Sequence, residues 1–224
     1  MCGRTSLFAS AERVRERFDA EPVRPLEPRY NVAPGDDHPA VLNDAPDEIR
    51  FPTWGLVPEW GDGSGHSNAR SETVADKPSF REAFAERRCL VLADGFYDWK
   101  PVPTGKQPYR IERADREPFA FAGLWEPARA DASTGADDPT FTVLTTEPNA
   151  VVEPIHHRMP VMLSPGEEGR WLREGGVDLL DPFPAEELRA YPVSDAVNDP
   201  ANDSPDVIEE VPAEEDVQTG LGDF

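Results

Sequence analysis

The sequence is short of cysteine and of long apolar runs. It has two cysteines, Cys2 and Cys89, which are too few for a disulfide framework and are spaced unlike any zinc-binding pattern. Every apolar stretch is interrupted within a few residues, so neither a signal peptide nor a membrane span is expected. This predicts a soluble, cytoplasmic protein. At 224 residues the chain can bury one good core, and we expect a single domain.

Basic side chains are also scarce, and the scarcity is uneven. Lys and Arg number 22 against 44 Asp and Glu, and only three of the 22 are lysine, so the net charge is −22. Residues 1–130 hold 18 basic and 22 acidic side chains, whereas residues 131–224 hold 4 and 22. Such an acidic composition suggests a halophile-like source, where a strongly charged surface keeps proteins soluble. In the nearly balanced first part, an arginine cluster could still face phosphate.

Hydrophobic periodicity and turn signals predict more strand than helix. Helices are expected at 10–18, capped by Ser10, at 79–87, where Ser79 and Glu82 would form a capping box, at 165–174 and at 184–189. Strands are expected at 41–42, 49–51, 89–93, 94–100, 109–112, 119–124 and 140–145. Cys89 should be a small core residue, and the proline-rich region around 29–35 should form an ordered loop.

The C-terminal part differs from the rest in composition. No Lys or Arg follows Arg189, and the last residues are acidic with interspersed prolines. We therefore expect a folded domain over residues 1–204 and an acidic, loosely ordered tail over residues 205–224.

The second residue offers unusual chemistry. Removal of Met1 would leave Cys2 with a free α-amine and a thiol, whose reference pKa values are about 7.7–8.0 and about 8.5. An aldehyde can form an imine with this amine, and the thiolate can then close a five-membered thiazolidine ring. Taken alone, however, Cys2 is better explained as a small residue that follows the start codon, and only the rest of the chain favours the chemical role.

Three other stretches contain candidate site residues. Asp98 lies between two aromatic residues, and it either faces solvent or acts as a catalytic group at a strand end. His156 and His157 are adjacent, which fits an acid–base histidine or a surface pair better than a zinc site. Trp54 and Trp60 flank a proline, and such tryptophans belong either to the core or to a platform for base stacking.

Taken together, the motifs of the chain resemble those of the SRAP family, the SOS response-associated peptidases or abasic-site processing proteins. The resemblance spans nearly the whole chain. Its motifs are Met1-Cys2-Gly3-Arg4, the stretches 29–35, 54–60, 68–73, 93–99 and 144–146, His156 with Arg158-Met159-Pro160, and Tyr191-Pro192-Val193-Ser194. The fold implied is α+β, a single compact domain with a curved, barrel-like antiparallel β-sheet and peripheral helices.

The resemblance also implies a function. Such a protein removes its own Met1 and crosslinks Cys2, through a thiazolidine, to the ring-opened sugar of an abasic site in single-stranded DNA. It would act as a monomer and need no cofactor or metal. Asn68 would hold the amine and the substrate, Asp98 would assist proton transfer, and His156 would act on the sugar and in reversal of the crosslink. The DNA-binding residues implied are Arg4, Asn31, Trp54, Arg70, Thr145 and Arg158.

Two departures from the family pattern stand out. The acid is typically glutamate in this family, whereas this chain has the shorter Asp98, and residues 195–205 are more acidic than expected. Two other readings remain. An N-terminal-nucleophile cysteine amidohydrolase or peptidase would use Cys2 to attack a small amide or peptide, with its own amine as the base. A binding module without enzymatic activity would carry the cysteine incidentally.

Overall fold

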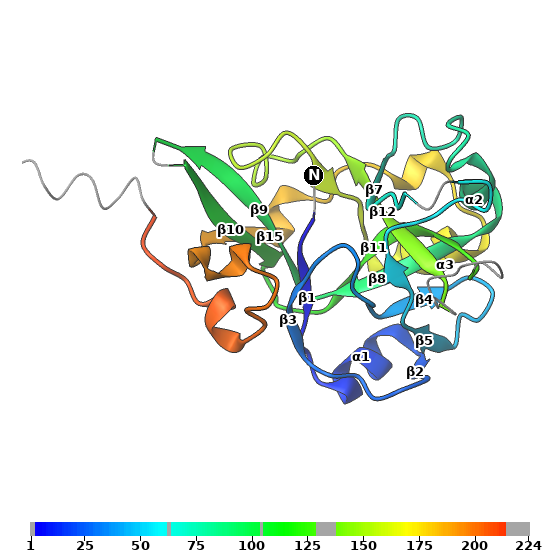
Figure 1. Cartoon of the computed structure of the whole chain (residues 1–224), viewed down its shortest axis with the longest axis horizontal. Helices are drawn as coiled ribbons and strands as arrows, with labels where there is room; N and C mark the ends of the chain where they lie inside the picture. The colour runs from blue at the N-terminus through cyan, green and yellow to red at the C-terminus, as the bar shows by residue number, and fades with distance from the viewer. Residues whose placement is uncertain (1–2, 62–63, 104, 129–137, 214–224) are drawn as a thin grey trace, which may run out of the picture.

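Two β-sheets form the framework of the molecule (Figure 1). The structure is a computed structural model that describes residues 3–61, 64–103, 105–128 and 138–213. The first sheet has the order β15-β10-β9-β1-β3. Its strands are β1 (Thr5–Leu7), β3 (Arg29–Val32), β9 (Gly95–Val102), β10 (Gly105–Arg113) and β15 (Leu188–Pro192).

The second sheet is larger and follows the order β13-β12-β11-β8-β4-β5-β2, with β14 paired to β11 and both β6 and β7 paired to β12. Its strands are β2 (Glu21–Pro22), β4 (Ala40–Leu42), β5 (Glu48–Arg50), β6 (Thr53–Trp54), β7 (Asn68–Arg70), β8 (Arg88–Ala93), β11 (Phe119–Glu126), β12 (Thr140–Thr146), β13 (Met159–Pro160) and β14 (Met162–Leu163). Most pairs are antiparallel, whereas β6 and β7 run parallel to β12, and β2 runs parallel to β5.

The main core lies between the two sheets. Phe96 and Ile111 from the first sheet belong to one buried cluster with Val91 and Phe121 from the second. Side chains alternate along a strand, so every second residue of β9 faces this core. The expected α+β domain with mostly antiparallel strands is confirmed, although within the described residues the two sheets stay open rather than closing into a barrel.

Helices pack on the other side of the second sheet. They are α1 (Ala11–Phe18), α2 (Arg81–Glu86) and α3 (Pro165–Arg173). Val14 of α1 and Trp171 of α3 are buried in one cluster with Leu92 of β8. The buried guanidinium of Arg88 donates to carbonyls at the C-terminal ends of α2 and α3, where the partial negative charge of a helix end favours a cation. Within the described ranges, no helix is both long and apolar enough to cross a membrane.

Local interactions explain where the expected elements differ. Helix α2 begins at Arg81 and lacks the expected side-chain cap by Ser79. The backbone amides of Phe80 and Arg81 donate to the carbonyl of Lys77 in the preceding turn instead. Residues 29–32 form strand β3 instead of a loop, since pairing with β1 holds them extended. The helix expected at 184–189 is only a 3-10 turn, η2 (Ala185–Glu187), and the sequence continues into β15 because it pairs with β10.

The C-terminal segment covers the outer face of the first sheet. It contains two 3-10 turns, η3 (Asp195–Asn198) and η4 (Pro205–Ile208). Val197 and Val207 pack with Tyr97 in a third buried cluster, and the amide of Val211 donates to the carbonyl of Pro192. Residues 205–213, expected in a loose tail, are therefore held to the domain by apolar packing. The rest of that tail, residues 214–224, lies outside the described residues.

Candidate active site

The N-terminal strand runs beside β9. Thr5 pairs with Phe96, and the amide of Tyr97 donates to the carbonyl of Arg4 at 3.0 Å. Because the two strands are antiparallel, Gly3, the first described residue, continues along β9 toward Asp98. Cys2 itself lies outside the described residues, and its role stays a prediction.

Asp98 is a buried carboxyl group in the middle of β9. It is only 3% exposed and lies on the same side of the strand as Phe96, so a position facing solvent is excluded. Its Oδ1 accepts a hydrogen bond from the amide of Trp99 at 3.0 Å, whereas Oδ2 accepts none within the described part of the chain. Burial raises the pKa of Asp98, and the nearby charge of His156 offsets part of this rise.

His156 faces this carboxyl group. Its Nδ1 lies 3.7 Å from Oδ2 of Asp98, 3.0 Å from the amide nitrogen of Arg158 and 3.1 Å from the carbonyl oxygen of Arg158. The amide can bond an unprotonated Nδ1, and the carbonyl can bond a protonated one, so the ring has a partner in either state. Burial lowers the pKa of His156, although Asp98 counteracts this.

The two opposite shifts bring the pKa values of Asp98 and His156 closer together. A proton can move easily between groups of similar pKa, which is what an acid–base pair requires. Among the described residues, no group of three or more His, Cys, Asp or Glu is placed to hold a metal ion. The arrangement therefore suits proton transfer.

Arg158 is tied to Glu72 across the site. Its guanidinium forms a bidentate ion pair with that carboxylate, and Nη2 also donates to the carbonyl of Thr145 at 2.5 Å. Arg158 is 9% exposed and Thr145 is fully buried. The expected phosphate contact of Arg158 stays a prediction, but the side chain already has a protein partner. We conclude that Arg158 connects the His156 segment to β12.

Strand β7 brings Asn68 and Arg70 to the same region. Its parallel pairing with β12 places Asn68 beside Val143 and Arg70 beside Thr145. The Asn68 amide donates to the Ser67 hydroxyl at 3.4 Å. The Arg70 side chain is exposed and forms no hydrogen bond or ion pair with a described residue, so its guanidinium is accessible to an anion.

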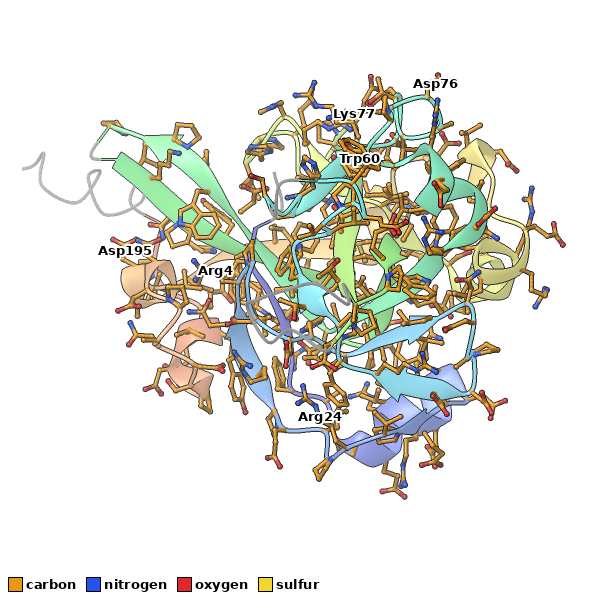
Figure 2. The ribbon with its side chains drawn as sticks, turned by 45° about the vertical axis from the view of Figure 1, so that its right-hand side comes forward. Arg4, Arg24, Trp60, Asp76, Lys77 and Asp195 are labelled. Carbon is orange, nitrogen blue, oxygen red and sulfur yellow. The ribbon has the colours of Figure 1, made fainter. Side chains whose placement is uncertain are left out.

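Arg4 and Asn31 hold the C-terminal segment. Nη1 of Arg4 donates to Oδ1 of Asn31 at 2.7 Å and to the carbonyl oxygen of Val197 at 2.6 Å. Asn31 is fully buried and donates to the carbonyls of Val197, Asp199 and Asn202. The Asn31 side chain therefore has protein partners in this conformation, and its contact with DNA stays a prediction. Figure 2 shows Arg4 close to the turn that carries Asp195, and a phosphate contact by Arg4 would have to coexist with these bonds.

Trp54 is a core residue. It is 1% exposed, stacks on Phe141 and donates its indole N–H to the carbonyl of Ser67. Its ring is therefore covered in this conformation, and its contact with DNA stays a prediction. Trp60, by contrast, is 68% exposed. Figure 2 shows it on the same edge of the molecule as Lys77. Of the two tryptophans, only Trp60 presents a ring to a ligand.

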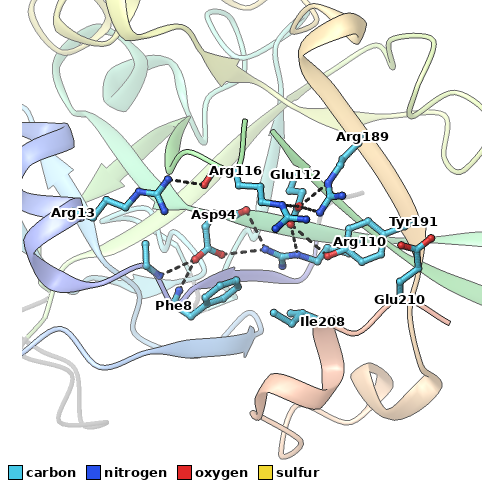
Figure 3. A pocket seen from close by; sticks show the side chains of 11 residues that line it. Phe8, Arg13, Asp94, Arg110, Glu112, Arg116, Arg189, Tyr191, Ile208 and Glu210 are labelled. Atoms are coloured by element: carbon cyan, nitrogen blue, oxygen red, sulfur yellow. Dashed lines mark hydrogen bonds and ion pairs between the residues drawn. The ribbon is translucent and has the colours of Figure 1, made fainter. Parts of the chain in front are cut away.

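A cavity of about 410 Å³ lies elsewhere, around the buried guanidinium of Arg110 (Figure 3). Arg110 donates to Ser6 and forms ion pairs with Asp94 and Glu112, and Glu112 also pairs with Arg189. None of the site residues expected from the sequence lines this cavity. Its charges are matched to one another, which is the pattern of a structural network.

Sequence reasoning gave no role to Glu72 or Arg110. A faint signal was present for Arg110, because a charged residue stands there in the strand Tyr109–Ile111, whose alternate positions are apolar. Glu72 had no comparable signal, since its partner Arg158 is 86 residues away.

The chain belongs to the SOS response associated peptidase (SRAP) family, whose pattern matches residues 1–200. One relative, the abasic site processing protein YoqW of Bacillus subtilis, is 39% identical, with 93% of this chain and 99% of the relative covered. The abasic site processing protein HMCES of Gallus gallus is 33% identical, with 93% and 77% covered. A crystal structure of a protein from Bacteroides thetaiotaomicron superposes with a TM-score of 0.82 at 28% identity, covering 94% of this chain and all of that chain.

Proposed function

We propose that this protein processes abasic sites in DNA by forming a covalent crosslink through Cys2. The observation that carries the proposal is the buried Asp98–His156 pair beside the N-terminal strand. The names of the relatives support the same substrate. The proposal extends to single-stranded DNA and to a monomeric protein.

The first step is removal of Met1. Hydrolysis adds one water across the Met1–Cys2 peptide bond, releases methionine and leaves a free α-amine on Cys2. The reaction needs a base to accept a proton from the nucleophile and an acid to protonate the leaving amine. Asp98 and His156 supply both, because their pKa values are shifted toward each other.

The second step joins Cys2 to the sugar. The α-amine attacks the aldehyde of the ring-opened deoxyribose, and loss of one water gives an imine. The thiol then adds across the C=N bond: sulfur bonds to carbon, and the proton ends on nitrogen. One aldehyde, one amine and one thiol thus give a thiazolidine and one water. A protonated Asp98 can donate to the departing hydroxyl group, and Asn68 can hold the amine.

Binding of the strand would use exposed groups. The guanidinium of Arg70 can contact a phosphate, and the exposed ring of Trp60 can stack on a base. An abasic sugar that reaches a buried acid–base pair has to turn out of the regular path of a duplex. That displacement is least costly in a strand that is already single, which supports the preference for single-stranded DNA.

The test is a denaturing gel of the full chain with a single-stranded oligonucleotide that contains one abasic site, together with intact-mass measurement. We expect protein without Met1 and an adduct that survives denaturation. Cys2→Ala should abolish the adduct. Cys2→Ser is the matched variant, since like Cys2→Ala it keeps the α-amine and lacks the thiol, but its hydroxyl group takes the place of the thiol. It should form only an imine that has to be trapped by borohydride.

Cys89→Ser is the control for the other thiol. Cys89 is fully buried and burial raises its pKa, so this substitution should leave the adduct unchanged. A stable adduct from Cys2→Ala would refute the mechanism. Loss of Met1 with no DNA adduct but with turnover of small amides would instead support the amidohydrolase reading.

A further inference from the structure

The turn η3 (Asp195–Asn198) lies against the strands that lead to the acid–base pair. It follows the motif at 191–194, to which the proposed function assigns no role. Ser194 caps the turn, because its side chain accepts a hydrogen bond from the amide of Ala196 at 3.2 Å. Val197 is fully buried and packs against the outer face of the first sheet. The turn is therefore firmly anchored to the domain.

One contact of this turn holds the residue that follows Asp98. The indole Nε1 of Trp99 donates a hydrogen bond to Oδ1 of Asn198 at 2.7 Å. The backbone amide of Trp99 in turn donates to Oδ1 of Asp98 at 3.0 Å. The turn is thus linked to the carboxyl group of the acid–base pair through a single residue.

A second contact of the turn holds the N-terminal segment. Nη1 of Arg4 donates to the carbonyl oxygen of Val197, the residue before Asn198, at 2.6 Å. The Arg4 guanidinium also lies over the Trp99 ring, 5.9 Å from its centroid. The carbonyl of Arg4 accepts a hydrogen bond from the amide of Tyr97 in β9. Two consecutive residues of the turn therefore hold both the chain that leads to Cys2 and the strand that carries the acid.

These contacts lie on the opposite face of β9 from the acid–base pair. Side chains alternate along a strand, so Tyr97 and Trp99 face away from Asp98. Tyr97 and Val197 are buried in the third cluster, and Trp99 packs against it. Phe96, on the same side of the strand as Asp98, belongs instead to the core between the sheets. A sugar at the acid–base pair is therefore separated from the turn by the strand itself.

From this arrangement we propose that Asn198 is a positioning residue for the crosslinking reaction. It bonds Trp99 while the residue before it bonds Arg4, and together these bonds fix the N-terminal segment relative to Asp98. Cys2 lies two residues before Arg4 in the sequence, so the contact limits where its amine and thiol can lie. Reacting groups have to be held about 3–3.5 Å apart, and holding them there raises the rate of the reaction. This inference rests on the proposed function and deepens it.

The experiment compares two aldehydes with the full chain. One is a single-stranded abasic oligonucleotide, for which the maximal rate of adduct formation and the half-saturating concentration are measured separately. The other is 2-deoxyribose 5-phosphate, which has no DNA strand attached. Intact mass gives the fraction of protein that lacks Met1, and rates are expressed per molecule of that form.

The variants break the indole bond from either end. Asn198→Leu removes the acceptor, and Trp99→Phe keeps a ring but removes the donor. Asn198→Asp is the conservative variant, since a carboxylate oxygen can accept the same N–H group. Asn43→Leu is the matched control, because Oδ1 of Asn43 accepts from the indole Nε1 of Trp125 at 2.9 Å, away from the acid–base pair. Asn198 is exposed, so its substitution should be compatible with folding.

We expect Asn198→Leu and Trp99→Phe each to lower the maximal rate at least about threefold, since a misplacement of about 1 Å can cost on the order of 100-fold. The half-saturating oligonucleotide concentration should stay the same, and the sugar phosphate should be slowed by the same factor, because the turn acts on the protein strands. The double variant should be no slower than the slower single variant, since both lose one shared bond. Asn198→Asp should retain the rate. Asn43→Leu should lower stability in urea and leave the rate unchanged.

Slowing of the oligonucleotide alone, through a higher half-saturating concentration, would make Asn198 a DNA contact and overturn the inference. Unchanged rates in Asn198→Leu and Trp99→Phe, with circular dichroism showing folded protein, would overturn it as well. An equal loss of rate in Asn43→Leu would reduce the bond to a contribution to stability. If the unmodified protein formed an adduct with neither aldehyde, the proposed function itself would be refuted and this inference with it, which is a different result.

Discussion

Two groups of buried charged residues, one around Arg110 and one around Asp98, differ in how fully their charges are paired. Around Arg110, each charged group has a partner: Asp94 and Glu112 receive hydrogen bonds from it, and Glu112 is also paired with Arg189. At Asp98, one carboxylate oxygen accepts no hydrogen bond within the described part of the chain, and Nδ1 of His156 lies 3.7 Å from it.

The pKa shifts follow the same division. Burial alone would raise the pKa of Glu112, but Arg189 and Arg110 lower it below its ordinary value. Burial raises the pKa of Asp98, and its surroundings do not cancel the rise. Removing one partner of a matched buried ion pair destabilises the folded chain. A buried carboxyl group without such a partner remains able to exchange a proton.

The largest expected effect comes from breaking the matched network. Arg110→Met leaves two buried carboxylates without their shared partner, so the free energy of unfolding should fall by about 3–5 kcal/mol. Urea denaturation measures this. Arg116→Met is the control, because its side chain is 71% exposed and should change stability by less than about 0.5 kcal/mol. A loss below about 1 kcal/mol for Arg110→Met would show that the network contributes little.

At the Asp98–His156 pair we expect a large effect on activity and a small effect on stability. Asp98→Asn should slow adduct formation or Met1 removal at least tenfold, the lower part of a range for acid–base catalysis of about 10²–10⁴. Stability should change by less than about 1 kcal/mol, since burial outweighs the attraction of His156 at this carboxyl group. Gel time courses and urea denaturation measure the two quantities separately.

Asp98→Glu is the conservative variant for this prediction. Glutamate is one methylene longer, and the 3.7 Å gap to His156 leaves room for the carboxylate to move closer, so activity should be retained. Full activity in Asp98→Asn would show that the carboxylate takes no part in proton transfer.

The contributions of Glu112 and Asp98 to the free energy of unfolding should change with pH in opposite directions. Glu112 has a lowered pKa, so its contribution to stability is present above its ordinary value of 4.5 and is lost as pH falls through the folded value. Asp98 has a raised pKa, so the folded state binds more protons than the unfolded state, and stability falls as pH rises above its ordinary value of 3.8.

Removing each group should therefore change the pH profile in opposite directions. Relative to the unmodified protein, Glu112→Gln should flatten the loss of stability below pH 4.5, and Asp98→Asn should remove the fall above pH 3.8. Thermal unfolding across this range tests the signs. Shifts of the same sign would show that the two environments are alike.

The smallest expected effect concerns salt. The net charge of −22 repels DNA in dilute buffer, and at about 1 M salt the Debye length is only about 3 Å, so this repulsion is nearly screened. Crosslinking should therefore rise toward molar KCl, and truncation after Val211 should move the optimum to lower salt. A yield that falls steadily with salt, while circular dichroism shows folded protein, would contradict this.

Local patterns predicted much of the fold. The apolar run Leu90–Ala93 is buried on both faces and forms a strand as expected. Ser10 caps α1, and its side chain accepts from the amide of Arg13. The errors come from partners far along the chain. Residues 188–192 form a strand because they pair with β10, and their local sequence does not indicate this pairing.

The site was predicted less completely. The motifs identified Asp98 and His156, and the structure brings them together across 58 positions of the chain. They could not distinguish Trp54 from Trp60, because two tryptophans in one motif look alike until a neighbour such as Phe141 covers one of them. They also could not indicate that Asn31 is buried beneath carbonyls from residues 197–202.

The bond between Arg4 and the carbonyl of Val197 sets the order in which the molecule can be completed during synthesis. Strand β1 is synthesised before its neighbours in the sheet, β3 and β9. The bond of Arg4 can form only after residue 197 has been synthesised. At about 5–20 residues per second, that wait is roughly 10–40 s. Throughout this interval Arg4 lacks the bond to Val197 that it has in the finished fold. Methionine removal by the protein itself would then be a step for the completed chain, whereas removal during synthesis would need another enzyme.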